Sequence, residues 1–387
     1  MKKRSSIDWY LMVPYIILCL FGIVMVYSAS AGIGLSFGQG EATMLAEKQT
    51  FYFLIGLVII FCVNKFFFKF ILSNRFVIYL FWGLLVALLY VKLLGKTING
   101  AAGWISLGFF SLQPAEFCKF FFIIFFALIL RKRQLNIENY GLGTSFKENF
   151  FPLFIPATIL LLIAVQPDTG GAAINFMIVF AMLLGASRSG KTLRNWTGIV
   201  AFFIIAFYTA SSFFADVGQH IHSYQVQRIV AFHNPFLHAQ TSGAQLINSF
   251  YAISNGGLAG RGLGNSIQKM GYLPEANTDF IISIISEEFG LVGIIFVLGL
   301  LYFMIIQIIQ IGRQTNNLQY SSICYGTAAY LTIQTLFNAG GAVALVPLTG
   351  VALPFISYGG SSMFTLSLCI ALVLKISSIE KQEQLQK

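Results

Sequence analysis

The sequence predicts an all-α integral membrane protein, with ten transmembrane helices and a large extracellular loop between the seventh and the eighth. Three observations predict this class. Of the 387 residues, 57% are hydrophobic and 10% are charged, whereas about 25% of the residues of a soluble protein are charged. Apolar runs of roughly 18 or more residues recur along the chain, and each is long enough to cross a bilayer. A soluble fold could not cover 40 phenylalanines without leaving large apolar patches on its surface.

The predicted spans are the apolar runs, taken in order along the chain. The first resembles the apolar part of a signal peptide, but it is long enough to span and further spans follow, which favours an uncleaved helix. The stretch NGAAGWISLGFFSLQPAEFCK leads into the fourth span, QPDTGG separates the fifth from the sixth, and VPLTGVALPFISYGGSS leads into the tenth. The eighth and ninth exceed one bilayer thickness, so they should tilt or extend beyond it. We place the spans at 9–29, 50–71, 76–94, 112–131, 151–166, 171–187, 195–215, 279–311, 318–345 and 354–376.

Basic residues predict the orientation of these spans, because cytoplasmic loops are enriched in lysine and arginine. With both termini cytoplasmic, 17 of the 24 basic residues face the inside, and the reversed topology would put most of this charge outside. The net charge of +10 is therefore a property of membrane topology and not the footprint of a nucleic-acid partner. The chain, 1–387, forms one membrane domain, and its tail, 377–387, is expected to be a frayed, solvated cytoplasmic end.

One connection is long: residues 216–278 lie between the seventh and eighth spans on the external side. Idle loops of that length are rare in compact proteins. Within it, GAQLINSFYAISNGG has apolar residues at helical spacing, which predicts a short surface helix. The loop holds all four histidines, but no H-E-x-x-H motif or cysteine partner accompanies them, so protein-bound zinc is not expected. The five cysteines stand singly in apolar runs, which indicates core residues rather than disulfides.

Four of the fourteen acidic residues stand close together where this loop meets the eighth span: Glu275, Asp279, Glu287 and Glu288. Asp279 has two interpretations, as the N-cap of the helix or as a general base at the outer membrane face. Glu275 would share its face if the helix begins early, and two nearby carboxylates can divide acid and base roles. Glu287 and Glu288 would lie roughly 12–14 Å deeper, where charges need a cavity or a partner.

Three other polar stretches also have two interpretations each. The stretch SNGGLAGRGLGNS surrounds Arg261 with glycines, and it is either a flexible turn or a set of N–H groups that binds phosphate. Glu116 and Lys119 lie one helical turn apart, so they either neutralise each other or line a polar cavity for a lipid headgroup. Asp168 in QPDTGG either belongs to a tight hairpin or faces a functional site near the outer surface. The broken stretch before the tenth span requires cover by protein or a cavity.

Motifs along most of the chain closely resemble those of the SEDS family of shape, elongation, division and sporulation proteins. In order they are NGAAGWISLG…QPAEFCK, QPDTGGA, YQVQRIVAF, GGLAGRGLGNSIQKMGYLPEANTDFI, EEFG and LPFISYGGSS, within residues 8–375. The stretch GNSIQKMGYLPEANTDF and the VMVYSAS ending of the first span look more like the division branch than the elongation branch. One departure is Gly103, where many members have arginine before the tryptophan.

The resemblance implies a fold, an activity and partners. It implies ten helices with a large external loop after the seventh, and a peptidoglycan glycosyltransferase that joins lipid II units and releases undecaprenyl pyrophosphate. The partners it implies are a class B penicillin-binding protein, other divisome proteins and membrane lipid, at the division septum of the bacterial plasma membrane. The only cofactor considered is a divalent cation, Mg or Mn.

The resemblance also assigns the site. It makes Asp279 the essential acid, and a carboxylate there could take the proton of the attacking sugar hydroxyl. The departing pyrophosphate needs cations or N–H groups. Two rival functions stay open: a lipid II flippase, which needs a polar path to the cytoplasmic face, and a non-catalytic divisome scaffold, in which Asp279 is dispensable. The residues assigned to substrate binding are Glu275, Arg228, Glu116, Lys119, Trp104, Gln113, Arg261 and Asp168.

Overall fold

The computed structural model describes most of the chain, and its described residues are 7–32, 40–98, 101–106, 108, 110–133, 142–166, 168–185, 209, 212, 224–241 and 243–386. The predicted seventh span, apart from two residues, lies outside the described residues, as do two of the four histidines, His220 and His222. The described part is a bundle of long helices, which confirms the predicted helical membrane class. The ten-span count stays a prediction.

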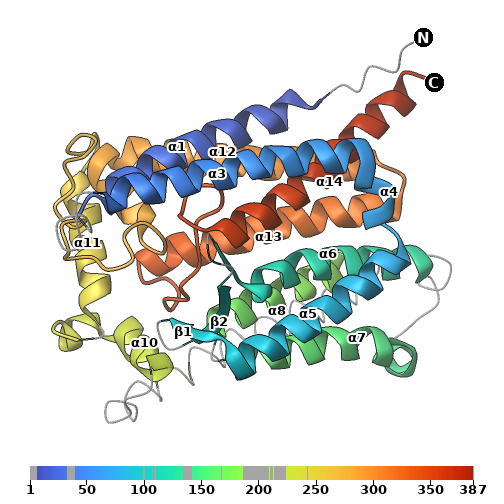
Figure 1. Cartoon of the computed structure of the whole chain (residues 1–387), viewed down its shortest axis with the longest axis horizontal. Helices are drawn as coiled ribbons and strands as arrows, with labels where there is room; N and C mark the ends of the chain where they lie inside the picture. The colour runs from blue at the N-terminus through green and yellow to red at the C-terminus, as the bar shows by residue number, and fades with distance from the viewer. Residues whose placement is uncertain are drawn as a thin grey trace.

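The long helices lie side by side along the long axis of the molecule (Figure 1). Among the described residues, five helical segments are long and apolar enough to cross a membrane: α1 (Trp9–Ser30), Glu41–Ile71, α5 (Asn74–Leu94), α12 (Ile281–Gln314) and α14 (Gly360–Gln384). The segment Glu41–Ile71 consists of α3 (Glu41–Cys62), a π-helical turn (Val63–Phe67) and α4 (Phe68–Ile71). The other long helices are α6 (Pro114–Arg133), α7 (Leu142–Val165), α8 (Thr169–Gly185) and α13 (Leu318–Ala342).

The two chain ends and the long loop lie at opposite ends of the bundle (Figure 1). The loop end carries α10 (Tyr224–His233), a short 3₁₀ helix (Pro235–His238) and α11 (Ala244–Gly256). The helix α11 confirms the surface helix predicted within the long loop. Helix α14 is the most buried of the five spanning segments and packs against α3, α6 and α13. Its neighbours therefore shield it from lipid, whereas α5 is largely exposed.

A small antiparallel sheet precedes α6, and the sequence did not predict it. Strands β1 (Lys96–Ile98), β2 (Ala101–Ser106) and β3 (Ser111–Leu112) pair in the order β1-β2-β3. Lys96 lies opposite Trp104 in this sheet. The predicted fourth span, 112–131, is correct as a helix only from Pro114, where proline takes the first helical position that it favours.

Helix α12 is not one continuous span, because its backbone leaves the helical region at Gly290, with φ 65° and ψ −159°. All residues of 281–288 are buried in protein. Beyond the break, Leu291, Val292 and Ile295 are exposed on an apolar surface of the kind that faces lipid. The excess length of the predicted eighth span is therefore a separate, protein-enclosed segment. The expectation that the eighth and ninth spans tilt or extend beyond the bilayer stays a prediction.

The C-terminal tail is ordered as part of α14, which continues to Gln384. Asp8, which is buried, accepts hydrogen bonds from Ser377 Oγ at 2.6 Å and from Lys381 Nζ at 2.9 Å. The expected fraying of the tail is therefore wrong as far as Gln384, whereas the expected solvent exposure is confirmed at residues 383–386. A charged side chain of the last helix and the N-cap of the first hold the two chain ends together.

Candidate active site

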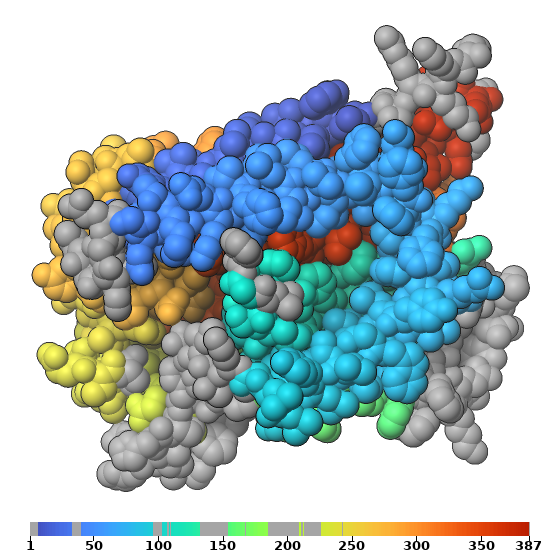
Figure 2. All heavy atoms as spheres, in the orientation of Figure 1, coloured from blue at the N-terminus to red at the C-terminus, as the bar shows by residue number. Residues whose placement is uncertain are grey.

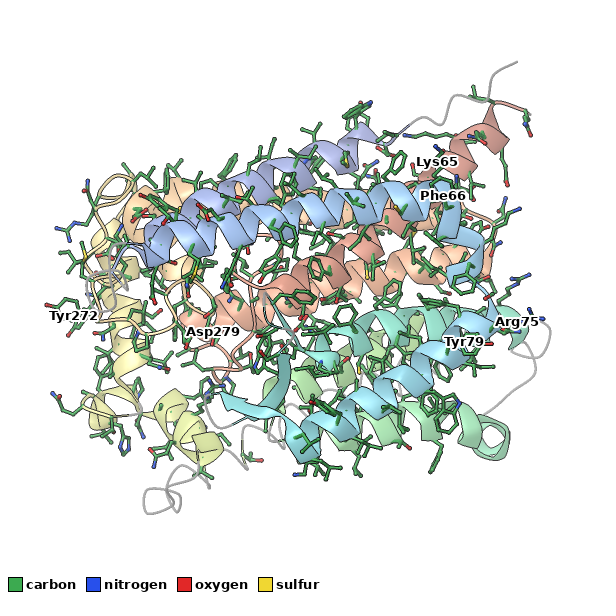
Figure 3. The ribbon with its side chains drawn as sticks, in the orientation of Figure 1. Lys65, Phe66, Arg75, Tyr79, Tyr272 and Asp279 are labelled. Carbon is green, nitrogen blue, oxygen red and sulfur yellow. The ribbon has the colours of Figure 1, made fainter. Side chains whose placement is uncertain are left out.

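Asp279 lies in the turn that precedes α12, toward the loop end of the bundle (Figure 3). Its backbone oxygen accepts a hydrogen bond from Asn338 Nδ2 of α13 at 2.8 Å. The preceding residue, Thr278, accepts one through its backbone oxygen from Ser357 Oγ at 2.5 Å. The N-cap position of α12 belongs to Phe280, and no side chain caps the helix. The N-cap interpretation of Asp279 is therefore wrong, and its carboxylate is left to face other groups.

The Asp279 carboxylate and the Arg228 guanidinium meet at Gly350. A Cβ atom built on Gly350 would lie 3.4 Å from Asp279 Oδ2 and 3.5 Å from Arg228 Nη1. Gly350 has φ 72°, a backbone conformation that glycine adopts without steric cost. Arg228 projects from α10, and its Nη1 donates a hydrogen bond to Leu348 O at 3.1 Å. A glycine thus brings a carboxylate and a guanidinium, from elements far apart in sequence, to one point.

Glu275 reaches the same site through a turn and not through a helix. Its φ of 55° is unusual for a residue other than glycine. Thr278 Oγ1 donates a hydrogen bond to Glu275 Oε2 at 2.9 Å, and Phe280 N donates one to Glu275 O at 3.2 Å. Because α12 begins only at Ile281, the expectation that both carboxylates share a helix face is wrong.

The surroundings of Asp279 change its acidity. Burial raises the pKa of Asp279, the negative charge of Glu275 raises it further, and Arg228 and Thr278 oppose both effects, which leaves a pKa of about 7. A carboxyl group with this pKa is partly ionised near neutral pH. Such a group accepts a proton more strongly than an ordinary aspartate and still releases it, which suits general base catalysis.

A second polar group of residues lies inside the bundle, at the first turn of α6. Lys119 Nζ contacts Glu116 Oε1 at 2.6 Å and Gln334 Oε1 at 3.1 Å, and its side chain is almost fully buried. Tyr330 donates a hydrogen bond to Glu116 Oε2 at 3.3 Å. Gln334 Nε2 donates to Ala352 O at 2.8 Å. The interpretation of Glu116 and Lys119 as a mutually neutralising pair is therefore correct, and the pair is linked to the loop before α14.

Gln113 and Asp168 form a third contact at this end of the molecule. Gln113 Nε2 donates to Asp168 Oδ2 at 3.2 Å, and Gln113 N donates to Ser361 Oγ at 2.9 Å. Asp168 Oδ1 also accepts from Gly171 N at 2.7 Å, as an N-cap of α8 does. Trp104 is partly buried in β2. Asp168 thus belongs to a tight turn, as one of its two interpretations predicted. It also has a polar partner, Gln113, that the sequence did not identify.

The irregular loop at 343–359 connects these three groups. Gly350 lies between Asp279 and Arg228, and Ala352 accepts the hydrogen bond from Gln334. A Cβ atom on Gly170, in the first turn of α8, would overlap Thr349 O. Sequence reasoning selected this broken stretch only as one that needed cover. It missed Asn338, Gln334, Gly350, Ser357 and Ser361.

Arg261 belongs to a different cluster. Its Nη1 lies 3.9 Å from Glu287 Oε1, and its backbone N donates to Glu287 O at 2.9 Å. The N–H groups of Gly260 and Gly262 donate to Gly256 O and Glu288 O. The N–H groups of Arg261 and Gly262 hold the loop against α12, and that of Gly260 bonds the end of α11, so the three are not free to bind phosphate in this conformation. Substrate binding by the Arg261 side chain stays a prediction.

One open cavity of the structure lies outside the Asp279 site, and the acidic residues of that site bear on the question of a bound cation. An open cavity of about 420 Å³ lies between α1 and α3, lined by Tyr27, Glu47 and Phe51 among others. Figure 2 shows a hollow in the face of the molecule between α3 and β2, with atoms of α14 visible inside it. In the described part of the chain, no three histidine, cysteine or acidic side chains come together as a metal site. Asp279 and Glu275 alone do not supply the ligand set of a dedicated Mg or Mn site.

The fold and the site together define a multi-pass helical membrane protein with a carboxylate and arginine site at the loop end of its bundle. The chain belongs to the FtsW, RodA and SpoVE family, described as cell cycle proteins, whose family model matches residues 9–382. This confirms the resemblance to the SEDS family.

Individual relatives cover nearly the whole chain. It is 34% identical over 388 residues to a probable peptidoglycan glycosyltransferase FtsW of Bacillus subtilis, covering 100% of this chain and 94% of the relative. It is 35% identical over 407 residues to the protein of that name in Lactococcus lactis, covering 100% and 96%. The chain is also 34% identical to stage V sporulation protein E of Bacillus subtilis, covering 97% of this chain and 98% of the relative.

Solved structures share the fold. A chain from a peptidoglycan synthase complex that coordinates polymerization and crosslinking matches with a TM-score of 0.72 and 23% identity, over 97% of this chain and 99% of that chain. The rod shape determining protein RodA of Thermus thermophilus matches with a TM-score of 0.66 and 23% identity, over 96% and 97%.

Proposed function

We propose that this protein is a peptidoglycan glycosyltransferase that polymerises lipid II into glycan strands at the outer membrane face during cell division. The observation that carries the proposal is Asp279, whose pKa is raised to about 7 and whose carboxylate meets Arg228 at Gly350. The relatives described above that are named as peptidoglycan glycosyltransferases support the same activity.

Asp279 acts as the general base. The attacking sugar hydroxyl gives its proton to the Asp279 carboxylate as its oxygen forms a bond to the anomeric carbon of the second substrate. The bond between that carbon and the diphosphate oxygen breaks, and undecaprenyl pyrophosphate leaves with both electrons of the bond. Arg228, oriented by its hydrogen bond to Leu348 O, stabilises the negative charge that develops on the diphosphate. Glu275 keeps the pKa of Asp279 high.

The remaining polar groups bind the substrate. Lys119 and Gln113 lie at the same end of the bundle, close to the loop before α14. They contact the diphosphate or the first sugar while the lipid tail stays in the membrane, and Glu116, Asp168 and Trp104 hold or line this region. The proposed site lies at the outer membrane interface, because the lipid carrier is apolar and the growing strand is in water.

The protein works with other components of cell-wall synthesis. A class B penicillin-binding protein supplies the crosslinking activity, in line with the solved complex in which polymerization and crosslinking are coordinated. Both termini face the cytoplasm, and the enzyme acts at the division septum with other divisome proteins. A divalent cation, Mg or Mn, is the one cofactor proposed, bound with the substrate diphosphate rather than in a dedicated protein site.

The polymerase is favoured over a lipid II flippase by where the polar groups lie. A flippase needs a polar path through the bundle to the cytoplasmic face. The described site residues instead gather at the loop end, around the segment 343–359. The raised pKa of Asp279 also supports an enzyme over a non-catalytic scaffold, because perturbed pKa values cluster at functional sites.

The test is the substitution Asp279→Asn in the purified complex with a penicillin-binding partner whose transpeptidase is blocked. Asparagine keeps the size of the side chain but accepts no proton. Glycan polymer from lipid II, separated on gels, should fall by about 10²- to 10⁴-fold, while thermal unfolding and partner binding stay as in wild type. The control is Glu383→Gln, an exposed acid near the opposite end of the molecule, which should polymerise normally. Output from Asp279→Asn within a few-fold of wild type would exclude the catalytic assignment.

A further inference from the structure

The end of α1 nearest the site makes three separate contacts with the segment that leads to Asp279. Ser30 Oγ accepts a hydrogen bond from Asn277 Nδ2 at 3.1 Å, two residues before Asp279. Ser28 Oγ accepts one from Lys269 Nζ at 2.9 Å. Gly32 lies so close to Lys269 that a Cβ atom built on it would overlap the Lys269 backbone oxygen and lie 3.0 Å from Met270 Cα.

The Ser28 contact includes a buried ion pair that the proposed mechanism does not use. Lys269 Nζ lies 2.7 Å from Glu288 Oε1, and both side chains are almost fully buried. Ser28 Oγ donates to Glu288 at 2.7 Å, so the three side chains form a closed triangle. Glu288 stands on the protein-enclosed part of α12, just after Asp279 in the chain. The triangle therefore ties the segment before Asp279 and the helix after it to the same point of α1.

The two sides of these contacts differ in secondary structure. In α1, Ala29 and Ser30 are fully buried, and the helix packs along α3 and α12. The loop segment forms turns rather than regular structure, is exposed at Tyr272, which Figure 3 labels, and is buried at Leu273 and Phe280. A helix end thus supports a segment that has buried side chains but no helix or strand of its own. Such a segment keeps its catalytic geometry only if its support is fixed, and a displacement of about 1 Å can cost about 10²-fold in rate.

We propose that Ser28 and Ser30 at the end of α1, with Gly32 just beyond it, are positioning residues, which hold the segment 269–280 so that the Asp279 carboxylate stays enclosed beside Arg228. The proposal rests on the proposed function, because it assigns to α1 the placement of the general base. The residues of α1 touch neither the substrate nor the reacting atoms. They act through Asn277, Lys269 and Glu288.

The first experiment measures the position of the segment without measuring activity. Hydrogen–deuterium exchange of the full-length protein in nanodiscs is compared for wild type, Gly32→Ala and the control Gly83→Ala. Gly83 is a helical glycine of α5 with no atom within 4 Å of an added Cβ. Gly32→Ala should increase exchange in peptides from 271–280 and leave α6 and α13 as in wild type. Unchanged exchange in 271–280, or an increase throughout α6 and α13, would overturn the proposal.

The second experiment measures catalysis with the hydrogen-bond variant Ser30→Ala and the control Ala31→Ser, at the exposed C-cap of α1. Ser30→Ala should lower kcat by about 3- to 30-fold with KM within about 2-fold, because geometry and not binding is lost. Its pH profile should shift toward lower pH, since a loosened segment lets water reach Asp279 and the burial that raises its pKa decreases. A fall in kcat with no shift of the profile would overturn the proposal. If Asp279→Asn stays active, the assignment of Asp279 as the general base fails, while the exchange experiment still decides whether the end of α1 holds the segment.

Discussion

The acidity of Asp279 is set by neighbours that arrive from other parts of the chain. Burial has the largest effect on its pKa, and Glu275 adds to it, while Arg228 and Thr278 reduce it. None of these effects is a property of the aspartate itself, whose ordinary pKa is about 3.9. The pKa of Asp279 is therefore set by individual neighbouring side chains, and substitution of one of them should change it.

The pH dependence of polymerisation should report this tuning. A general base must be ionised, so kcat/KM of the wild-type enzyme should rise as the pH increases through about 7, the pKa of Asp279. Glu275→Gln removes a negative charge that raises this pKa, so the pKa falls and the rising limb moves to lower pH. The pH profile of glycan polymerisation measures both. A limb that stays in place or moves to higher pH in Glu275→Gln would contradict the assigned coupling.

The Glu116 and Lys119 pair should show strong non-additivity in stability. Glu116→Gln leaves the buried Lys119 cation without its carboxylate, a change that typically costs about 3–5 kcal/mol. The double variant Glu116→Gln with Lys119→Met removes both charges at similar volume, so it should be less destabilised than the single variant. Thermal unfolding in detergent, arranged as a double-mutant cycle, measures the coupling. Losses that simply add would show that the 2.6 Å contact contributes nothing to stability.

At the scale of elements, the break in α12 divides one apolar run into two parts with different surroundings. Residues 281–288 are enclosed by protein, and the glycine-rich loop lies against the break, where Gly290 and Gly260 pack backbone to backbone. Glu287 and Glu288 lie in the enclosed part, so their charges meet hydrogen-bond donors and cations rather than lipid. The expectation that they need a partner is confirmed, and their depth in the membrane stays a prediction.

Gly290→Ala should destabilise the protein, and Gly299→Ala in the same helix should not. Gly290 has φ 65°, and a Cβ atom there would lie 2.5 Å from Leu258 C. The left-handed conformation costs alanine about 1–2 kcal/mol, and the overlap adds about 1–3 kcal/mol. A Cβ on Gly299 meets no atom within 4 Å, so alanine there should be neutral or slightly stabilising. The measurement is thermal unfolding in detergent, and equal midpoints for the two variants would refute the packing argument.

At the scale of the whole molecule, the two ends of the bundle differ in what they contain. The loop end carries the proposed chemistry, and the opposite end joins the first and last helices through Asp8 and Lys381. This arrangement fits the distribution of basic residues, which predicts that the chain ends are cytoplasmic. The distribution of charge predicts the orientation of the chain in the membrane, and the fold places the chain ends and the long loop at opposite ends of the bundle. The fold is thus in line with the predicted orientation.

Cysteine labelling should show the two ends on opposite sides of the membrane. In a background without the five native cysteines, Tyr272→Cys and Leu385→Cys introduce one thiol each at exposed positions. A membrane-impermeant reagent should label Tyr272→Cys in intact cells and Leu385→Cys only after lysis. The reverse pattern would place the long loop, 216–278, in the cytoplasm and would rule out polymerisation at the outer face.

The sequence by itself determined the membrane class and most of the helices, and it selected the candidate active residues. Hydropathy is a local property, so an apolar run indicates a helix in lipid wherever the rest of the chain goes. The motif around Asp279 selected the candidate acid, and the spacing of Glu116 and Lys119 indicated their pair. Local signals were misleading where one sequence pattern fits two different structures. The apolar run after Asp279 has the pattern of a single span, and Asp279 itself has the pattern of an N-cap.

Only the tertiary structure decided which residues surround the acid and what supports it. Gly350 and Arg228 reach Asp279 from segments more distant in sequence than any local pattern extends. The partner of Glu288 is Ser28, which is 260 residues away. Such contacts depend on how helices pack, and packing is decided by the shape of all side chains together rather than by the period of any one segment. Sequence therefore identifies which groups are available for chemistry, and the fold determines the distance and burial that give them their pKa values and their support.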